Sequence, residues 1–159
     1  MRGTIGGGLF ALLLFPALLS LAPDTANAGS LVAKVLPDGP EIARLDIPEG
    51  TGWCVLWRHS VKGFEVQDCY ENRGGHMVLA RSHQPDFAAG LGHIEGRGTQ
   101  TSDGQGGYWI LDIDEPVPGD AYVLRPGTMK VDHRLSAASG EVSLSARAAH
   151  ERVLISLEN

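Results

Sequence analysis

Residues 53–70 read WCVLWRHSVKGFEVQDCY, and this stretch decides the fold. It contains two of the three tryptophans of the chain and both of its cysteines. Suppose that Cys54 lies opposite Cys69 in an antiparallel pair of strands. A four-residue loop, 60–63, then joins the two strands, which is a common length for a hairpin. The stretch therefore predicts a β-hairpin in a defined register.

This register sorts the side chains of the hairpin into two faces. One face carries the cysteines and an opposite-charge pair, Arg58 and Glu65, and the other face is largely aromatic. A slip by one residue would mix the two faces, so charges, cysteines and aromatic residues favour the same pairing. Cross-strand pairs of these kinds contribute about 0.2–1 kcal/mol each. The pairs expected on the aromatic face are Trp53 with Tyr70, Trp57 with Val66, and His59 with Phe64.

The first 28 residues have the composition of a secretory signal. Arg2 precedes an apolar run at 9–19, and the segment ends in the small-x-small triplet Ala26-Asn27-Ala28. We expect cleavage after Ala28, which leaves a single β domain over residues 29–159. The alternative is an N-terminal membrane anchor, but the run is shorter than the roughly 20 apolar residues that span a bilayer. The sequence predicts a periplasmic protein that contacts the membrane only through this segment, if it stays uncleaved.

The charge and the cysteine content limit the kinds of partner and the compartment that the sequence predicts. The formal net charge is −6, and no basic run occurs, which argues against nucleic acid or anionic lipid as the main partner. Export places the chain in an oxidising compartment, where two cysteines allow one intramolecular disulfide. We therefore expect a Cys54–Cys69 bridge.

The rest of the mature chain alternates short apolar-polar segments with Gly and Pro turns. Only residues 147–151 have helix-forming composition, enough for one turn, and residues 84–107 are rich in glycine and predicted to form a long loop. The pattern is typical of an all-β, single-domain antiparallel sandwich or barrel of about 8–10 short strands. Outside the hairpin, strands are expected at 31–36, 42–47, 76–83, 108–114, 121–125, 128–135, 141–146 and 152–157.

A catalytic interpretation of the hairpin rests on His59, Ser60 and Glu65. Histidine, hydroxyl and carboxylate are the groups of a nucleophile, base and orienting acid. In the predicted register, however, His59 and Glu65 point to opposite faces, and such a triad needs them in contact. No Gly-x-Ser-x-Gly turn surrounds Ser60. We expect Ser60 to bond loop backbone, Glu65 to pair with Arg58, and the protein to have no catalytic residue.

The histidines predict no metal site. His76 and His83 are separated by an odd number of residues, so they would face opposite sides of a regular strand. No His-x-His or His-Glu-x-x-His spacing occurs. We therefore expect neither a metal nor another cofactor. The six histidines are His59, His76, His83, His93, His133 and His150.

The aromatic residues leave two interpretations open. They can form the core of a small β domain, which is the commoner case, or line a platform for a ligand with the 84–107 loop folded over it. The second interpretation gives an alternative function, a small-molecule or metal-binding module. The residues concerned are Trp53, Trp57, Tyr70, Tyr108 and Trp109.

The order of these features resembles the domain-of-unknown-function family numbered 1850. The resemblance rests on an aromatic strand that enters His59-Ser60-Val61, then Glu65, a Gly-Ala-Gly-like element at 89–92, and the pair Tyr108-Trp109. It extends over about residues 31–157. Ala89 stands where the pattern has glycine, and the cysteine pair is not part of the pattern.

The resemblance implies a small exported or membrane-anchored protein with no established biochemical activity. Members are often encoded beside tripartite transporters of the TAXI type, which depend on a periplasmic binding protein. We therefore expect a non-enzymatic accessory whose partner is a periplasmic solute-binding protein or a membrane subunit of such a transporter. The residues expected to contact a partner or ligand are His59, Ser60, Lys62, Glu65, Gly90, Gly92 and Trp109.

Overall fold

The computed structural model describes residues 1, 3, 28–85 and 96–159. Residues 2 and 4–27 of the expected signal segment and the predicted binding residues Gly90 and Gly92 lie outside the described residues. Twelve strands are present in the described part. They are β1 (Ser30–Val35), β2 (Glu41–Asp46), β3 (Gly52–Arg58), β4 (Glu65–Arg73), β5 (His76–Gln84), β6 (Thr99–Ser102), β7 (Tyr108–Leu111), β8 (Glu115–Pro116), β9 (Ala121–Leu124), β10 (Arg134–Ala137), β11 (Gly140–Ser143) and β12 (Val153–Glu158).

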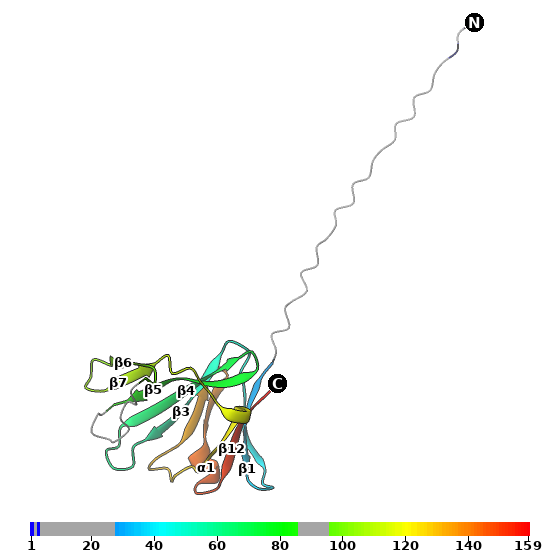
Figure 1. Cartoon of the computed structure of the whole chain (residues 1–159). Helices are drawn as coiled ribbons and strands as arrows, with labels where there is room; N and C mark the ends of the chain where they lie inside the picture. Colours follow the sequence, from blue (N-terminus) through cyan, green and yellow to red (C-terminus); the bar gives the residue numbers. More distant parts are fainter. Residues whose placement is uncertain (2, 4–27, 86–95) are drawn as a thin grey trace.

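The strands form two antiparallel sheets. The smaller sheet has the order β2-β1-β12-β9, and the larger has the order β11-β10-β3-β4-β5-β7-β6, with β8 also paired to β5. Neither sheet closes on itself, so the all-β prediction is confirmed in its sandwich form rather than as a barrel. In Figure 1 the strands β3 to β7 of the larger sheet lie to the left, and β1 and β12 of the smaller sheet lie to the right.

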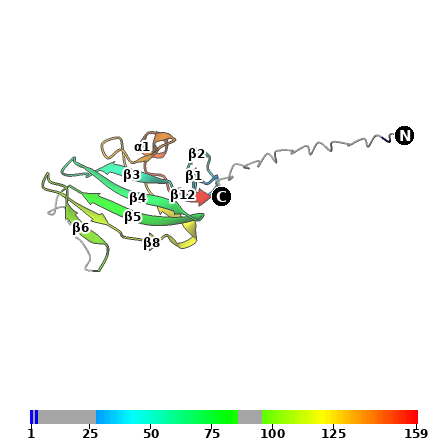
Figure 2. The same cartoon turned by 90° about the horizontal axis from the view of Figure 1, so that it is seen from above.

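The main core lies between the two sheets. Strands of the smaller sheet contribute apolar side chains that are almost fully buried, and they meet Trp53, Val55 and Leu135 from the larger sheet. A second, smaller cluster of Leu79, Tyr108, Ile110 and Ile113 continues the same face of the larger sheet beyond β4. The larger sheet therefore extends past the smaller one. Figure 2 shows this extension, with β6 and β8 on the side of β5 that is remote from β1 and β12.

A buried asparagine ties the loop before β3 to the end of β4. Asn72 is fully buried, and its amide nitrogen donates to the Ile47 carbonyl over 2.8 Å. Its side-chain oxygen accepts from the Gly75 backbone N–H over 2.9 Å. Both polar ends are thus satisfied, as a buried amide requires.

The predicted hairpin is confirmed residue by residue. Strands β3 and β4 pair Cys54 with Cys69, Trp57 with Val66 and Arg58 with Glu65. The disulfide joins Cys54 and Cys69, as predicted. His59 donates its backbone N–H to the Phe64 carbonyl over 2.8 Å and so closes the four-residue loop. The aromatic face turns inward, with Trp53 only 2% exposed.

Three local predictions were wrong. Residues 128–133 do not form the first part of a strand, because Val131 and Asp132 donate backbone N–H groups back to the Thr128 carbonyl and make a turn. The single α-helix of the described residues, α1 (Leu144–Ala148), starts earlier than expected because Ser143 caps its first turn. The count of strands exceeds the 8–10 expected because β6 and β8 fall where loops were predicted.

The fourth difference is a bulge in β5. Cys69 pairs with Arg81, but the next residue, Tyr70, pairs with Leu79, so Ala80 is an extra residue in the ladder. A bulge of this kind reverses the facing of the side chains on one side of it. His76 and His83 therefore share a face of the sheet, contrary to the prediction for a regular strand. In the part of the chain described here, no helix is long and apolar enough to cross a membrane.

Candidate functional site

The tip of the hairpin, residues 59–63, is an exposed loop. Ser60 and Lys62 are exposed, and His59 is half-buried with its ring 5.1 Å from that of Phe64. His59 Nδ1 accepts a backbone N–H from Lys62 over 3.2 Å. The histidine, rather than Ser60 as predicted, therefore holds the loop backbone.

Glu65 has a different partner from the one expected. Its carboxylate forms an ion pair with Arg134 on β10, and Arg58 instead lies 4.0 Å from the carboxylate of Asp132. Glu65 sits opposite Arg58 in the ladder, but the neighbouring strand β10 supplies the cation. This geometry leaves His59, Ser60 and Glu65 without a shared hydrogen-bond network.

A second predicted residue, Trp109, lies on the outer face of the larger sheet, away from the sandwich core. The same face carries the disulfide, Arg81 and Leu111, as the pairing of β3, β4, β5 and β7 requires. The Arg81 guanidinium carbon lies 5.7 Å from the centre of the Trp109 ring, a cation–π contact. We call this region the Arg81 surface; it consists of Cys54, Cys69, Arg81, Thr101, Trp109 and Leu111.

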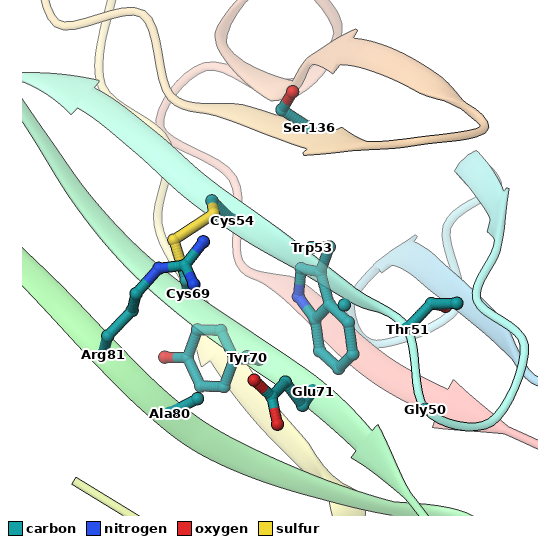
Figure 3. A pocket seen from close by; sticks show the side chains of 11 residues that line it. Gly50, Thr51, Trp53, Cys54, Cys69, Tyr70, Glu71, Ala80, Arg81 and Ser136 are labelled. Carbon is teal, nitrogen blue, oxygen red and sulfur yellow. A yellow bond between two sulfur atoms is a disulfide. The ribbon is translucent and has the colours of Figure 1, made fainter. Parts of the chain in front are cut away.

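Three shallow hollows meet at Arg81. One, of about 230 Å³, runs from the disulfide to Thr51 and Ser136. Figure 3 shows it, with the Arg81 side chain extended over the sulfur atoms. The second, of about 300 Å³, lies beside Trp109, and the third, of about 160 Å³, lies toward Glu71. Arg81 is exposed, and the described residues offer its guanidinium no carboxylate within ion-pair distance.

The Trp109 ring is held in place by a histidine and an aspartate. The His83 ring lies 4.5 Å from the Trp109 ring, and His83 Nε2 is 2.9 Å from an oxygen of Asp103. The other oxygen of Asp103 accepts the backbone N–H groups of Gln105 and Gly107 over 2.7 and 2.9 Å. The Gln105 backbone N–H, followed by the His83 side chain, lowers the pKa of the Asp103 carboxyl. This carboxylate therefore orders the β6–β7 turn and orients His83 against Trp109.

An Asp103→Asn variant tests this role through pH. A carboxyl whose pKa is lowered on folding contributes stability that is complete above its unfolded pKa, about 3.9, and is lost as the pH falls below it. We expect wild type to exceed D103N in unfolding free energy at about pH 5, and this excess to shrink at about pH 3. Urea unfolding at both pH values measures it. An excess that is equal at both would contradict the assignment.

A separate pocket opens between the two sheets. We call it the inter-sheet pocket; it has a volume of about 190 Å³ and is lined by Val55, Trp57, Asp68, Tyr70, Tyr122, Leu124 and His133. Two ring stacks build its walls. The rings of Tyr70 and Tyr122 are 5.3 Å apart, and those of Trp57 and His133 are 6.1 Å apart.

Burial shifts the pKa values of the ionisable groups in this pocket. Burial raises the pKa of Asp68, although the Ser82 hydroxyl, which donates to its carboxylate over 2.6 Å, acts in the other direction. Burial also raises the pKa of Tyr70, to about 12, and lowers that of His133. The Gly127 backbone N–H donates to His133 Nδ1 over 3.1 Å, which fits a neutral ring. The pocket thus combines an acid in an apolar setting with aromatic rings.

The predicted aromatic platform is divided between the two faces of the larger sheet. Trp53, Trp57 and Tyr70 face the smaller sheet, Tyr108 is buried in the second cluster, and Trp109 alone faces outward. Adjacent residues of a strand point to opposite faces, so the sequence already separates Tyr108 from Trp109.

Several site residues were not predicted. Arg81 and His83 are two apart on a strand, a spacing that places them on one face. No short-range signal brings Tyr122 and His133 to Asp68, because they come from β9 and the segment before β10. Within the described residues, no group of three or more His, Cys, Asp or Glu side chains is arranged to hold a metal ion.

Comparison with protein-family models gave a match. A family model described as a domain of unknown function (DUF1850) matches residues 54–144, more than half of the chain. Curated proteins and solved structures gave no match. The matched segment contains the hairpin tip, the residues of the Arg81 surface and those of the inter-sheet pocket, but not β1, β2 or β12.

Proposed function

Since this chain belongs to the DUF1850 family, as its hairpin residues predicted and the match over residues 54–144 shows, we propose that it is a non-enzymatic, exported accessory protein that binds a subunit of a TAXI-type tripartite transporter. The partner is the periplasmic solute-binding protein or a membrane subunit. The association with this transporter class comes from the resemblance of the hairpin and the aromatic pair to the family.

Export is supported by two features. The apolar N-terminal run and its small-x-small end are typical of a cleaved signal. The Cys54–Cys69 disulfide fits an oxidising compartment such as the periplasm.

The observation that carries the binding proposal is the Arg81 surface. Its exposed guanidinium rests on a tryptophan that His83 and Asp103 hold in position. Residues that dominate the energy of protein interfaces are most often Trp, Tyr and Arg. Because the Trp109 ring is fixed before binding, little side-chain entropy is lost when a partner covers it. The three hollows around Arg81 offer sites for partner side chains.

The hairpin tip belongs to the proposed contact region as a second element. Ser60 and Lys62 are exposed, and Val61 is 83% exposed, so the tip presents both polar and apolar side chains to a partner. His59 and Phe64 close the loop beneath them.

Replacing Trp109 by alanine tests the proposal. We expect the affinity for the transporter subunit to fall about 30-fold, since a central interface residue contributes about 2 kcal/mol or more. Tagged wild type and W109A are co-expressed with the transporter subunits, and the captured subunit is quantified at several concentrations. Val123→Ala removes an exposed apolar side chain from β9 of the other sheet and should leave capture unchanged. If wild type captures no subunit, or W109A captures as much as wild type, the proposal is wrong.

A second candidate function is the binding of a small molecule in the inter-sheet pocket. The observation that favours it is an apolar, aromatic cavity of about 190 Å³ that contains a carboxylate. The expected contribution of the 84–107 loop concerns residues partly outside the described part of the chain.

A further inference from the structure

The inter-sheet pocket contains a charge that its own walls do not balance. Asp68 is the single acidic residue among its lining residues, and neither lysine nor arginine lines it. Within residues 28–85 and 96–159, no cation lies at ion-pair distance from Asp68. Arg97 acts on it from a longer range and is itself paired with Glu115 over 2.9 Å. A partly buried carboxylate without a counter-ion is energetically costly.

The hydrogen bonds of Asp68 orient this carboxylate without neutralising it. Gln84 donates its side-chain amide to the Ser82 hydroxyl over 2.9 Å, and Ser82 donates in turn to one Asp68 oxygen over 2.6 Å. The described residues provide no hydrogen bond to the second oxygen. That oxygen remains available to a ligand.

The other walls of the pocket suit a cation with an apolar body. Trp57 and two tyrosines supply electron-rich rings, and a tryptophan ring attracts cations most strongly among the aromatic side chains. Val55 and Leu124 supply aliphatic contacts. His133 does not compete for the carboxylate as a cation, because its Nδ1 accepts a backbone N–H and burial disfavours its charged form.

A polar group also stands unpaired in the pocket wall. The Tyr122 hydroxyl is buried, and Trp53 Nε1 is near enough to influence it, but the two atoms do not reach the geometry of a hydrogen bond. This hydroxyl oxygen is closed off from the pocket space, so the ligand contacts the ring of Tyr122 and not its hydroxyl.

We propose that the inter-sheet pocket binds a small organic cation, with its ammonium group against Asp68 and its apolar substituents against the rings of Trp57, Tyr70 and Tyr122. The volume of about 190 Å³ is below the 300–1,000 Å³ range of pockets for drug-sized ligands, so the ligand has few heavy atoms. This inference deepens the second candidate function, and it does not depend on the transporter partner.

The test compares two nearly isosteric probes, choline and 3,3-dimethylbutan-1-ol, in which a carbon replaces the charged nitrogen. Binding to the full chain is followed by calorimetry and by the indole N–H signals of the tryptophans in NMR, at constant ionic strength. We expect choline to bind at least tenfold more tightly than the alcohol, and the Trp57 signal to shift. Equal affinity for the two probes, or no binding of choline, would overturn the proposal.

Two variants locate the site. Asp68→Asn keeps the shape of the side chain and should reduce the affinity for choline at least tenfold, whereas Asp38→Asn, in an exposed turn, should not change it. The circular dichroism spectrum of D68N confirms that it is folded. Equal losses in both variants would indicate a general effect of charge and contradict the assignment. Capture of the transporter subunit by D68N should equal that of wild type, so this inference and the proposed function fail separately.

Discussion

Replacing Trp53 by alanine is expected to lower the free energy of unfolding by about 3–5 kcal/mol, the range for large aromatic residues in protein cores. Trp53 is 2% exposed and lies in the main core between the two sheets. Its ring stacks on that of Tyr70 at 5.5 Å, and Tyr70 stacks on Tyr122 of the smaller sheet. The substitution therefore removes a large side chain from the core between the sheets and leaves one face of the Tyr70 ring without its partner.

Urea unfolding of wild type and variant measures this loss, with Trp109→Ala as the matched control. Trp109 is half-buried on the outer face, so its removal should cost much less. If W53A is unfolded, Trp53→Phe gives the same information, because a phenyl ring keeps part of the packing and removes an indole N–H that is buried without a hydrogen bond. W53F should lose less stability than W53A and more than W109A. An equal loss of stability in W53A and W109A would contradict the placement of Trp53 in the core.

Removal of the disulfide is expected to cause the second large loss of stability. The bridge closes a loop of 15 residues, for which the chain-entropy model gives about 3 kcal/mol. We expect a Cys54→Ala, Cys69→Ala double variant to keep its fold, since the β3–β4 ladder and the core do not depend on the sulfur atoms, but to unfold at a lower urea concentration.

The oxidation state is established first, by intact mass after alkylation without reductant. The expected result is no alkylated thiol. The double variant should then match wild type that has been unfolded and refolded with reductant present. A double variant as stable as oxidised wild type would show that the bridge does not constrain the chain.

The hairpin was predictable because three kinds of cross-strand pair within one short segment all indicate the same register. The cysteines, the Arg58–Glu65 pair and the aromatic residues all lie within 18 residues. Because side chains alternate between the two faces of a strand, one assigned cross-strand pair fixes all the other pairs. The partner of Glu65 was not predictable in the same way. It comes from Arg134, which is 69 residues away in the sequence, and only the order of strands in the sheet brings it there.

Irregularities of the backbone explain the other differences. The bulge at Ala80 places His76 and His83 on one face, and nothing in the local sequence marks it. Thr128 to His133 alternate like a strand, but Asp132 has a positive φ of 50° and its neighbours form a turn. The inter-sheet pocket depends on β3, β4 and β9 together, so it follows from the packing of the two sheets rather than from any one segment.

The most direct test of the proposed function is site-specific photo-crosslinking in cells that express the transporter. A photoreactive amino acid is placed at Thr101, which is exposed on the Arg81 surface, or at Val123, which is exposed on the smaller sheet. We expect a crosslink to the solute-binding protein or a membrane subunit of the transporter from position 101 and none from position 123. Crosslinks to that subunit from position 123 alone, or from neither position, would contradict it.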